Sequence, residues 1–209
     1  LRQKRRLPQK LYLRHLRLPG GWQAEYIPIS GAASMTAGYN QAMQASSAKY
    51  KIYLHQDAFL VYPDAVMECI KIFEQNLKVG MIGLAGCKKL PDSGVWWQAE
   101  KTYGLVAHAL EPESLQVTDY GKVAAAFPPV QAIAGGFMAT QYDLPWREDI
   151  FRAWHFYDIS QSLEFGRQGY EVVIPQQQEP WCVHACGRKP IGDYHHWREI
   201  FIREYDTVL

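Results

Sequence analysis

Several features that would assign this chain to a familiar class of protein are absent. No stretch reaches the roughly 18 to 20 uninterrupted apolar residues that a membrane-spanning helix needs, and the basic N-terminus is not followed by the apolar segment of a signal peptide. The sequence also has no Gly-rich phosphate loop, no G-x-S-x-G turn and no G-x-G-x-x-G motif. It therefore gives no support to a membrane-spanning protein, a P-loop nucleotidase, a serine hydrolase or a Rossmann-type dehydrogenase.

Cysteine is scarce and irregularly spaced. The 209 residues include four cysteines, Cys69, Cys87, Cys182 and Cys186, and the first two lie in or beside apolar runs, where free thiols are common. A chain of this length can bury a core without disulfides, so we expect reduced cysteines and a cytoplasmic location. Hydrophobic residues make up 48% and charged residues 21%, the ordinary proportions of a globular protein.

Acidic residues are missing from the first 17 positions, where seven basic residues occur. Without that segment the chain has 15 basic and 21 acidic residues, a net charge of −6 against +1 for all 209 residues. We interpret residues 1–18 as a basic N-terminal helix with a solvated face, and a peripheral contact with an anionic membrane is the second interpretation. No nucleic-acid-binding motif accompanies the basic run, so no nucleic-acid partner is expected.

The hydrophobic pattern alternates between strand-like and helix-like segments. Ser34 is a suitable N-cap for a helix over 34–46, in which Met35, Tyr39 and Met43 recur every four residues. The other predicted elements are strands at 24–30, 49–54, 79–85, 131–140, 171–174 and 181–184, and helices at 9–18, 63–77, 158–168 and 193–205.

This alternation predicts an α/β fold with a mostly parallel sheet flanked by helices. We interpret residues 1–209 as a single domain. The segment 87–130 is less regular, with Trp96, Trp97 and several Pro and Gly residues, and we expect loops and short strands there. A doubly wound domain normally has a strand before the helix predicted at 9–18, so we expect that first strand to be missing at the N-terminus.

A polar triplet, His55-Gln56-Asp57, follows the strand predicted at 49–54. Residues two apart in an extended segment point the same way, so His55 and Asp57 would face one site. Ligands of open α/β sheets bind beyond the carboxyl ends of strands. An imidazole with a carboxylate suits Mn²⁺, and a carboxylate suits Mg²⁺. The alternative is that Asp57 caps a turn and His55 packs in the core.

His184 follows another predicted strand and is the candidate third metal ligand, from the far end of the chain. Cys182, His184 and Cys186 alternate with period two, which superficially resembles a zinc site. A structural zinc needs four ligands at tighter, paired spacing. We therefore rank zinc below a purely structural role for His184.

Asp158 is the candidate general base. It ends the run Trp154-His155-Phe156-Tyr157-Asp158, which opens a predicted helix, and a carboxylate there can take a proton from a sugar hydroxyl. With Gln161 three residues on, Asp158 also matches a capping box, a structural device compatible with that role. The aromatic residues nearby can stack on a sugar, but aromatic side chains more commonly fill a core; they are Trp146, Trp154 and Tyr157. Candidate diphosphate contacts are Arg147, Lys88 and Lys89.

Five segments occur in a recognisable order, namely 34–40 (SMTAGYN), 53–57 (YLHQD), 135–138 (GGFM), 154–164 (WHFYDISQSLE) and 181–184 (WCVH). Together they resemble the family-2-type glycosyltransferases of the GT-A fold. The resemblance is strongest to a bacterial subset described as glycosyltransferase-like or streptomycin-biosynthesis-like proteins. It covers roughly residues 9–205, nearly all of the sequence, and its specificity lies in the order and spacing of the motifs.

The resemblance implies roles for these residues. His55-Gln56-Asp57 takes the place of an Asp-x-Asp motif, so Asp57, with His55 and His184, would hold Mn²⁺ or Mg²⁺ and the donor diphosphate. Gly135-Gly136 would line the cleft for donor and acceptor, and Asp158 would be the base of an inverting reaction. The candidate nucleotide-sugar and acceptor contacts are Ser34, Gly135, Gly136, Trp154, His155 and Arg147.

These assignments predict an enzyme that moves a sugar from a nucleoside-diphosphate sugar, with UDP favoured, to an unknown saccharide or lipid-linked acceptor. His55 replaces the first acid of the motif, and Ser30-Gly31-Ala32 stands where an Asp-Asp-Gly-Ser run usually contacts the nucleoside. The alternative is therefore a non-catalytic or degenerate nucleotide-diphosphate-binding module on the same fold. A further rival is a metal-dependent phosphoester hydrolase that uses the same three ligands.

Overall fold

The structure is a computed structural model that describes residues 15–111, 114–185, 187 and 192–208. Most of the basic segment predicted as a helix over 1–18 lies outside the described residues. Its last part, 15–18, is included and is not helical.

The described residues form four α-helices, one 3₁₀ turn and eleven strands. The helices are α1 (Met35–Gln44), α2 (Ala65–Gln75), α3 (Tyr157–Arg167) and α4 (Tyr194–Tyr205), and the 3₁₀ turn is η1 (Trp96–Gln98). The strands are β1 (Lys51–Leu54), β2 (Ala58–Leu60), β3 (Val79–Gly83), β4 (Ala85–Cys87), β5 (Thr102–Glu111), β6 (Ser114–Gly121), β7 (Pro129–Val130), β8 (Ala132–Ile133), β9 (Phe137–Thr140), β10 (Glu171–Val173) and β11 (Cys182–His184).

The central sheet has five strands in the order β1-β9-β3-β10-β7. β9 pairs antiparallel with both β1 and β3, and β10 pairs parallel with β3 and antiparallel with β7. The α/β fold is confirmed, whereas the sheet is mixed and not mostly parallel as expected. β9, far along the chain, lies between β1 and β3. The arrangement is compatible with a GT-A-like fold.

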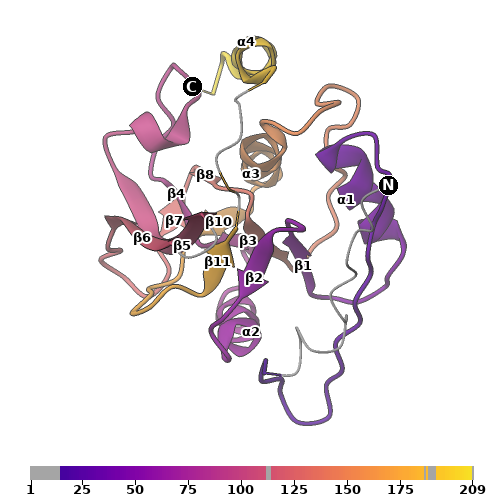
Figure 1. The fold of residues 1–209 in the computed structure, drawn as a ribbon. Coiled ribbons are helices and arrows are strands. Elements are labelled where there is room, and N and C mark those ends of the chain that lie inside the picture. The colour runs from indigo at the N-terminus through magenta and orange to yellow at the C-terminus, as the bar shows by residue number, and fades with distance from the viewer. Residues whose placement is uncertain (1–14, 112–113, 186, 188–191, 209) are drawn as a thin grey trace.

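Helices cover both faces of this sheet (Figure 1). Successive residues of a strand point to opposite faces. Ile82 of β3 accordingly belongs to the buried cluster that contains Phe73 of α2. Its neighbour Met81 belongs to the cluster that contains Tyr39 of α1 and Phe165 of α3. The central strands are therefore buried on both sides, which explains their uninterrupted apolar sequence.

A second sheet of six strands, β2-β11-β5-β4-β8 with β6 paired to β5, lies beside the first. β5 and β6 form an antiparallel hairpin of 10 and 8 residues inside the segment 87–130, where loops and short strands were expected. β6 is exposed along most of its length, and its apolar Leu115 and Val117, which alternate with polar residues, are themselves exposed. At the base of the hairpin, Gly104 has φ 115°, and a Cβ there would lie 2.1 Å from the Leu84 carbonyl oxygen.

The strand predicted at 24–30 is wrong. These residues are mostly exposed and pair with no described strand. Their apolar pattern has another origin: Ile29 packs near α1, its Cγ2 lying 3.6 Å from where a Cβ of Gly38 would sit. An extended segment becomes a strand only where a neighbour satisfies its backbone groups, and β1 takes its partner from β9 instead.

Two strands predicted as continuous are each divided between the two sheets: 79–85 becomes β3 and β4, and 131–140 becomes β8 and β9. The strands β1, β10 and β11 and the four helices agree with the sequence predictions to within a few residues. α4, the last of them, covers α3 through Phe201 and Tyr205, which are fully buried in one cluster with Ile159 and Leu163. No helix in the described part of the chain is long and apolar enough to cross a membrane.

Candidate functional site

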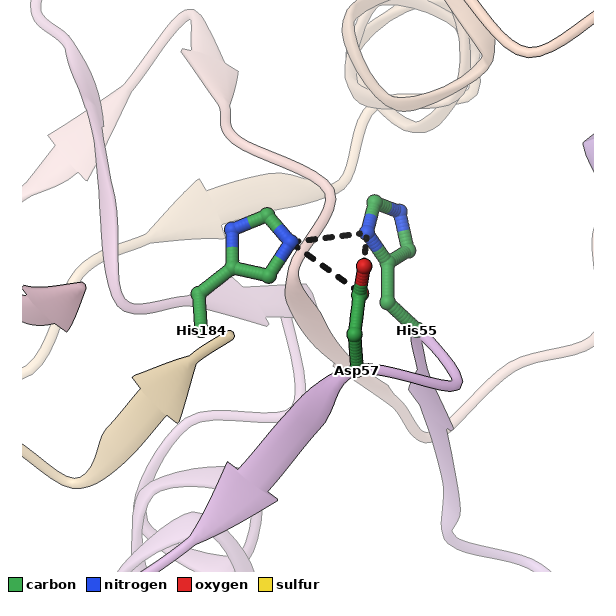
Figure 2. Close-up of side chains that lie close together, drawn as sticks. All are labelled: His55, Asp57 and His184. Atoms are coloured by element: carbon green, nitrogen blue, oxygen red, sulfur yellow. Dashed lines mark hydrogen bonds and ion pairs between the residues drawn. The ribbon is translucent and has the colours of Figure 1, made fainter. Parts of the chain in front are cut away.

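Three side chains converge where the two sheets meet (Figure 2). His55 directly follows β1, Asp57 directly precedes β2, and His184 ends β11. One ligand atom from each lies within 4.8 Å of the others. The Asp57 Oδ1 atom is 3.2 Å from His184 Nε2 and 3.8 Å from His55 Nδ1, and the two ring nitrogens are 3.4 Å apart. The three residues named as metal ligands are thus brought together, although 129 positions separate the two histidines.

Backbone pairing fixes this arrangement. β2 and β11 pair antiparallel, with Ala58 opposite His184, which puts Asp57 beside the end of β11. The Ala185 N–H donates to the Asp57 carbonyl at 2.7 Å, and the His55 N–H donates to the Gly136 carbonyl at 3.4 Å. Each of the three side chains therefore projects from a segment whose own backbone is held in place.

The donor set suits a divalent metal ion. Two imidazole nitrogens and a carboxylate oxygen, all half-buried, point at a common centre. The histidines present different atoms to it, Nδ1 of His55 and Nε2 of His184. Mg²⁺ prefers an all-oxygen shell, whereas imidazole suits transition ions. The residues fit an ion such as Mn²⁺ better than they fit Mg²⁺.

Tyr157, the first residue of α3, contacts the opposite edge of the His55 ring. Its hydroxyl is hydrogen-bonded to His55 Nε2. The ring is buried, and burial first, followed by the nearby carboxylates of Asp158 and Asp57, keeps the pKa of the phenol well above its ordinary value. The sequence identified Tyr157 only as a sugar-stacking or core residue. No spacing rule links positions 55 and 157, so sequence reasoning had no signal for this contact.

Gly135 makes room for that tyrosine. A Cβ at position 135 would lie 2.1 Å from the Tyr157 hydroxyl and 2.6 Å from the ring carbon that bears it. Gly136 has more space, since the nearest atom to its missing Cβ is His184 Nδ1 at 4.0 Å. Paired glycines in a strand permit a close approach, and at Gly135 the group that approaches is a side chain of the protein itself.

Asp158 lies beside the paired glycines. Its Oδ2 accepts from the Gly135 N–H at 2.7 Å, and its Oδ1 accepts from the Ile159 N–H at 2.9 Å. Burial raises the pKa of the carboxyl to about 6, and these backbone donors oppose the rise. A carboxylate with a pKa near neutrality is suited to accept a proton.

The capping box predicted for Asp158 is wrong. The N-cap of α3 is Phe156, and Asp158 lies within the first turn of the helix. Gln161 does not reach back to the helix start but donates to the Leu144 carbonyl at 2.8 Å. Phe156 has φ 61°, an uncommon conformation for a bulky residue, which reverses the chain immediately before Tyr157 and Asp158.

His108 is a further residue that the sequence did not single out. It lies on β5 directly opposite His184 of β11, and the centroids of the two rings are 6.0 Å apart. Burial and the neighbouring His184 lower the pKa of His108. A neutral imidazole therefore lies next to the proposed metal ligand His184.

Two predicted contact residues have structural partners. Ser34 is only 3% exposed, and its hydroxyl caps α1 by accepting from the Ala37 N–H at 3.1 Å. Arg147 forms ion pairs with three carboxylates, at distances of 3.0 to 3.2 Å, from Asp149, Glu164 and Glu204.

The other predicted contacts lie at the surface. Trp154 is 55% exposed and precedes α3 by three residues. His155 lies 3.6 Å from Asp193 and makes an edge contact with Tyr194. Lys88 and Lys89 are exposed just beyond β4.

The period-two arrangement of Cys182, His184 and Cys186 does not make a zinc site among the described residues. Cys182 is buried, is absent from the cluster of ligand atoms, and has a pKa raised by burial to about 11. Cys186 lies outside the described residues.

Comparisons with known proteins agree with the geometry. No curated protein matches this chain. A family model described as "Glycosyltransferase like family", of the glycosyltransferase family 2 type, matches residues 7–205. Because that match spans nearly the whole sequence, the chain belongs to this family of glycosyltransferase-like proteins.

Proposed function

We propose that this protein transfers a sugar from a nucleoside-diphosphate sugar to an acceptor hydroxyl, with the help of a divalent metal ion. Membership of a glycosyltransferase-like family supports the reaction class. The observation that carries the proposal is the convergence of His55, Asp57 and His184 at the ends of β1 and β11. Ligands of α/β sheets bind at such strand ends.

The three ligands define the role of the ion. A divalent cation, when bound, neutralises the charge that develops on a diphosphate leaving group. His55, Asp57 and His184 would hold it, with the remaining coordination positions left for the diphosphate. Because two of the three donors are nitrogen, we propose Mn²⁺ or a similar transition ion before Mg²⁺.

Asp158 is proposed as the general base of an inverting transfer. The acceptor oxygen would attack the anomeric carbon while Asp158 takes its proton and the diphosphate leaves from the opposite face. Its pKa of about 6 leaves the carboxyl ionised at neutral pH and still basic enough to accept a proton. The Asp158 carboxylate accepts a hydrogen bond from the Gly135 N–H, and the carbonyl of the neighbouring Gly136 accepts one from the His55 N–H. The proposed base and one metal ligand are therefore both bonded to this pair of glycines.

The donor and acceptor contacts are a further part of the proposal. We favour a UDP-sugar donor and a saccharide or lipid-linked acceptor. We propose the exposed Trp154, with His155 beside it before α3, as a contact for an acceptor ring. The buried free thiols suit a reducing compartment such as the cytoplasm; they are Cys69, Cys87 and Cys182.

The experiment that tests the proposal is a calorimetric titration of the protein with UDP and GDP, with and without Mn²⁺. Binding of one nucleotide only when Mn²⁺ is present is expected, and it would identify the base of the donor. Equal binding without the metal would contradict the metal-bridged diphosphate. Absence of binding to either nucleotide would contradict the proposed function.

A binding module without catalysis is the alternative, and one observation favours it. Both carboxylate oxygens of Asp158 already accept backbone N–H groups. The discriminating variant is Asp158→Asn, assayed with the nucleotide sugar that the titration identifies. In the enzyme the substitution leaves nucleotide affinity intact and abolishes transfer or slow hydrolysis of the donor. In a binding module the wild type itself turns over no donor.

A further inference from the structure

The His55 ring is held between two different environments. Its Nδ1 faces the ligand atoms of Asp57 and His184, and its Nε2 meets the hydroxyl of Tyr157 on the other side. A neutral imidazole carries one proton, and a nitrogen that binds a metal must be free of it. The protonation state of Nε2 therefore decides whether Nδ1 is ready to bind an ion.

Tyr157 can determine which nitrogen of His55 carries the proton because the tyrosine side chain is itself fixed in position. The ring is buried, and it fills the space left by the missing side chain of Gly135. The hydroxyl oxygen has lone pairs to accept a hydrogen bond from Nε2–H. Partners on the outer nitrogen commonly fix the tautomer and orientation of metal-binding histidines.

We propose that Tyr157 is a positioning residue for the metal centre: its hydroxyl accepts the Nε2–H of His55 and so keeps His55 Nδ1 unprotonated and aimed at Asp57 and His184. This inference rests on the proposed metal-dependent function. It assigns Tyr157 a role that neither the family match nor the cluster of three ligands includes. Loss of an outer partner of this kind typically lowers metal affinity by roughly 10- to 100-fold.

The chain offers a matched control in Tyr39. This residue is also a buried tyrosine, and its ring centroid lies 5.8 Å from that of Tyr157. Its hydroxyl has no hydrogen-bond partner among the described residues. Tyr157→Phe and Tyr39→Phe therefore each remove one buried hydroxyl from the same aromatic cluster, but only the first removes a contact with His55.

Two measurements test the proposal on the full chain. The first is a calorimetric titration with Mn²⁺ alone on the wild type and both variants. Tyr157→Phe is expected to weaken binding by roughly 10- to 100-fold, while Tyr39→Phe binds as the wild type does. The second is ¹⁵N NMR of the metal-free protein with labelled histidine, with His55→Ala used to assign the signals. The wild type should show His55 protonated at Nε2, and Tyr157→Phe should show a mixture of the two tautomers.

The outcomes separate this inference from the proposed function. If the wild type binds Mn²⁺ and Tyr157→Phe binds it equally well with the same His55 tautomer, the positioning role is overturned and the proposed function stands. If the wild type binds neither Mn²⁺ nor nucleotide, the proposed function fails. The NMR measurement then still tests the hydrogen bond from His55 Nε2–H to the Tyr157 hydroxyl, because a wild-type His55 protonated at Nδ1 contradicts it.

Discussion

Asp57 is the charged member of the three-ligand cluster, and its carboxylate lies between the two imidazoles (Figure 2). We expect Asp57→Asn to weaken Mn²⁺ binding by at least about 100-fold, since losing even an outer partner typically costs 10- to 100-fold. Calorimetric titration with Mn²⁺ measures the change. The matched control is Asp92→Asn, which removes an exposed carboxylate elsewhere on the surface. Equal loss in both variants would point to general electrostatics and against a local ligand.

A second prediction for a single residue concerns Asp158. Its raised pKa of about 6 means that the carboxyl ionises later than an ordinary aspartate. A general base acts in its ionised form, so kcat/KM should be half-maximal near pH 6, reach a plateau at higher pH, and fall about tenfold per pH unit at lower pH. The profile must be recorded at saturating Mn²⁺, because protonation of His55 and His184 also releases the metal at low pH.

A direct titration of the Asp158 carboxyl tests whether this group causes the fall in rate at low pH. In a ¹³C NMR titration of the carboxyl groups, the Asp158 signal should have its midpoint near pH 6. A midpoint near 4, the ordinary value for aspartate, together with an unchanged rate profile, would assign the acid limb to the histidines and remove Asp158 as the base.

Single residues differ in how far the sequence could locate them. His55 and Asp57 were predictable because an extended segment puts alternate residues on one side and the strand end fixes the place. His184 was named because it follows another predicted strand, but its place beside Asp57 depends on the pairing of β11 with β2, which no local pattern predicts. The Tyr157 contact depends on the turn at Phe156, where φ is 61°, and on the space at Gly135. Neither is encoded in a periodic pattern.

At the scale of elements, the β8–β9 connection and the start of α3 fit together through Gly135. We expect Gly135→Ala to destabilise the protein by about 1 to 3 kcal/mol, the usual range for overpacking. Its Cβ would overlap the Tyr157 hydroxyl at 2.1 Å. The matched control is Gly166→Ala in the exposed part of α3, where nothing lies within 4 Å of the added carbon. That variant should be more stable by roughly 0.5 to 1 kcal/mol, because alanine favours the helix.

Chemical denaturation of both glycine variants gives the two free energies of unfolding. The same samples should show weakened Mn²⁺ binding for Gly135→Ala only, because the displaced Tyr157 can no longer support His55. If Gly135→Ala is as stable as the wild type, the close packing at that position is not the constraint that the structure indicates.

Elements were predictable where one face is buried against a helix. α2 and β3 have strong apolar patterns and appear where expected, since both contribute to the same buried cluster. Short strands were expected within 87–130, but the length of the β5–β6 hairpin was not predicted, and β6 is mostly exposed. The false strand at 24–30 shows the converse: Ile29 packs near α1, but the segment is mostly exposed and no described strand pairs with it. An apolar pattern alone does not make a strand, because the backbone groups also need a partner.

At the scale of the molecule, the candidate site lies where the two sheets meet. β1 of the five-stranded sheet supplies His55, and β2 and β11 of the six-stranded sheet supply Asp57 and His184. Local sequence could not predict this junction, because it depends on the order of strands far apart in the chain. The mixed sheets arise in the same way, with β9 placed antiparallel between β1 and β3.

Arg147 links α3, α4 and the loop that precedes α3. Its guanidinium pairs with Glu164 of α3 and Glu204 of α4, and also with Asp149 of its own loop. The predicted role as a diphosphate contact would require it to leave these carboxylates. We expect Arg147→Met, which keeps the apolar stem, to lower the free energy of unfolding by roughly 1 to 3 kcal/mol, the range for charged hydrogen bonds.

Nucleotide binding separates the two roles of Arg147. With its guanidinium committed to α3 and α4, the Arg147→Met variant should bind UDP or GDP in the presence of Mn²⁺ as tightly as the wild type, while melting at a lower temperature. Arg203→Met, on the exposed side of α4, is the control and should change neither quantity. A marked loss of nucleotide affinity with unchanged melting would instead show that the guanidinium serves the diphosphate. In that case the ion pairs would be a resting arrangement that the donor replaces.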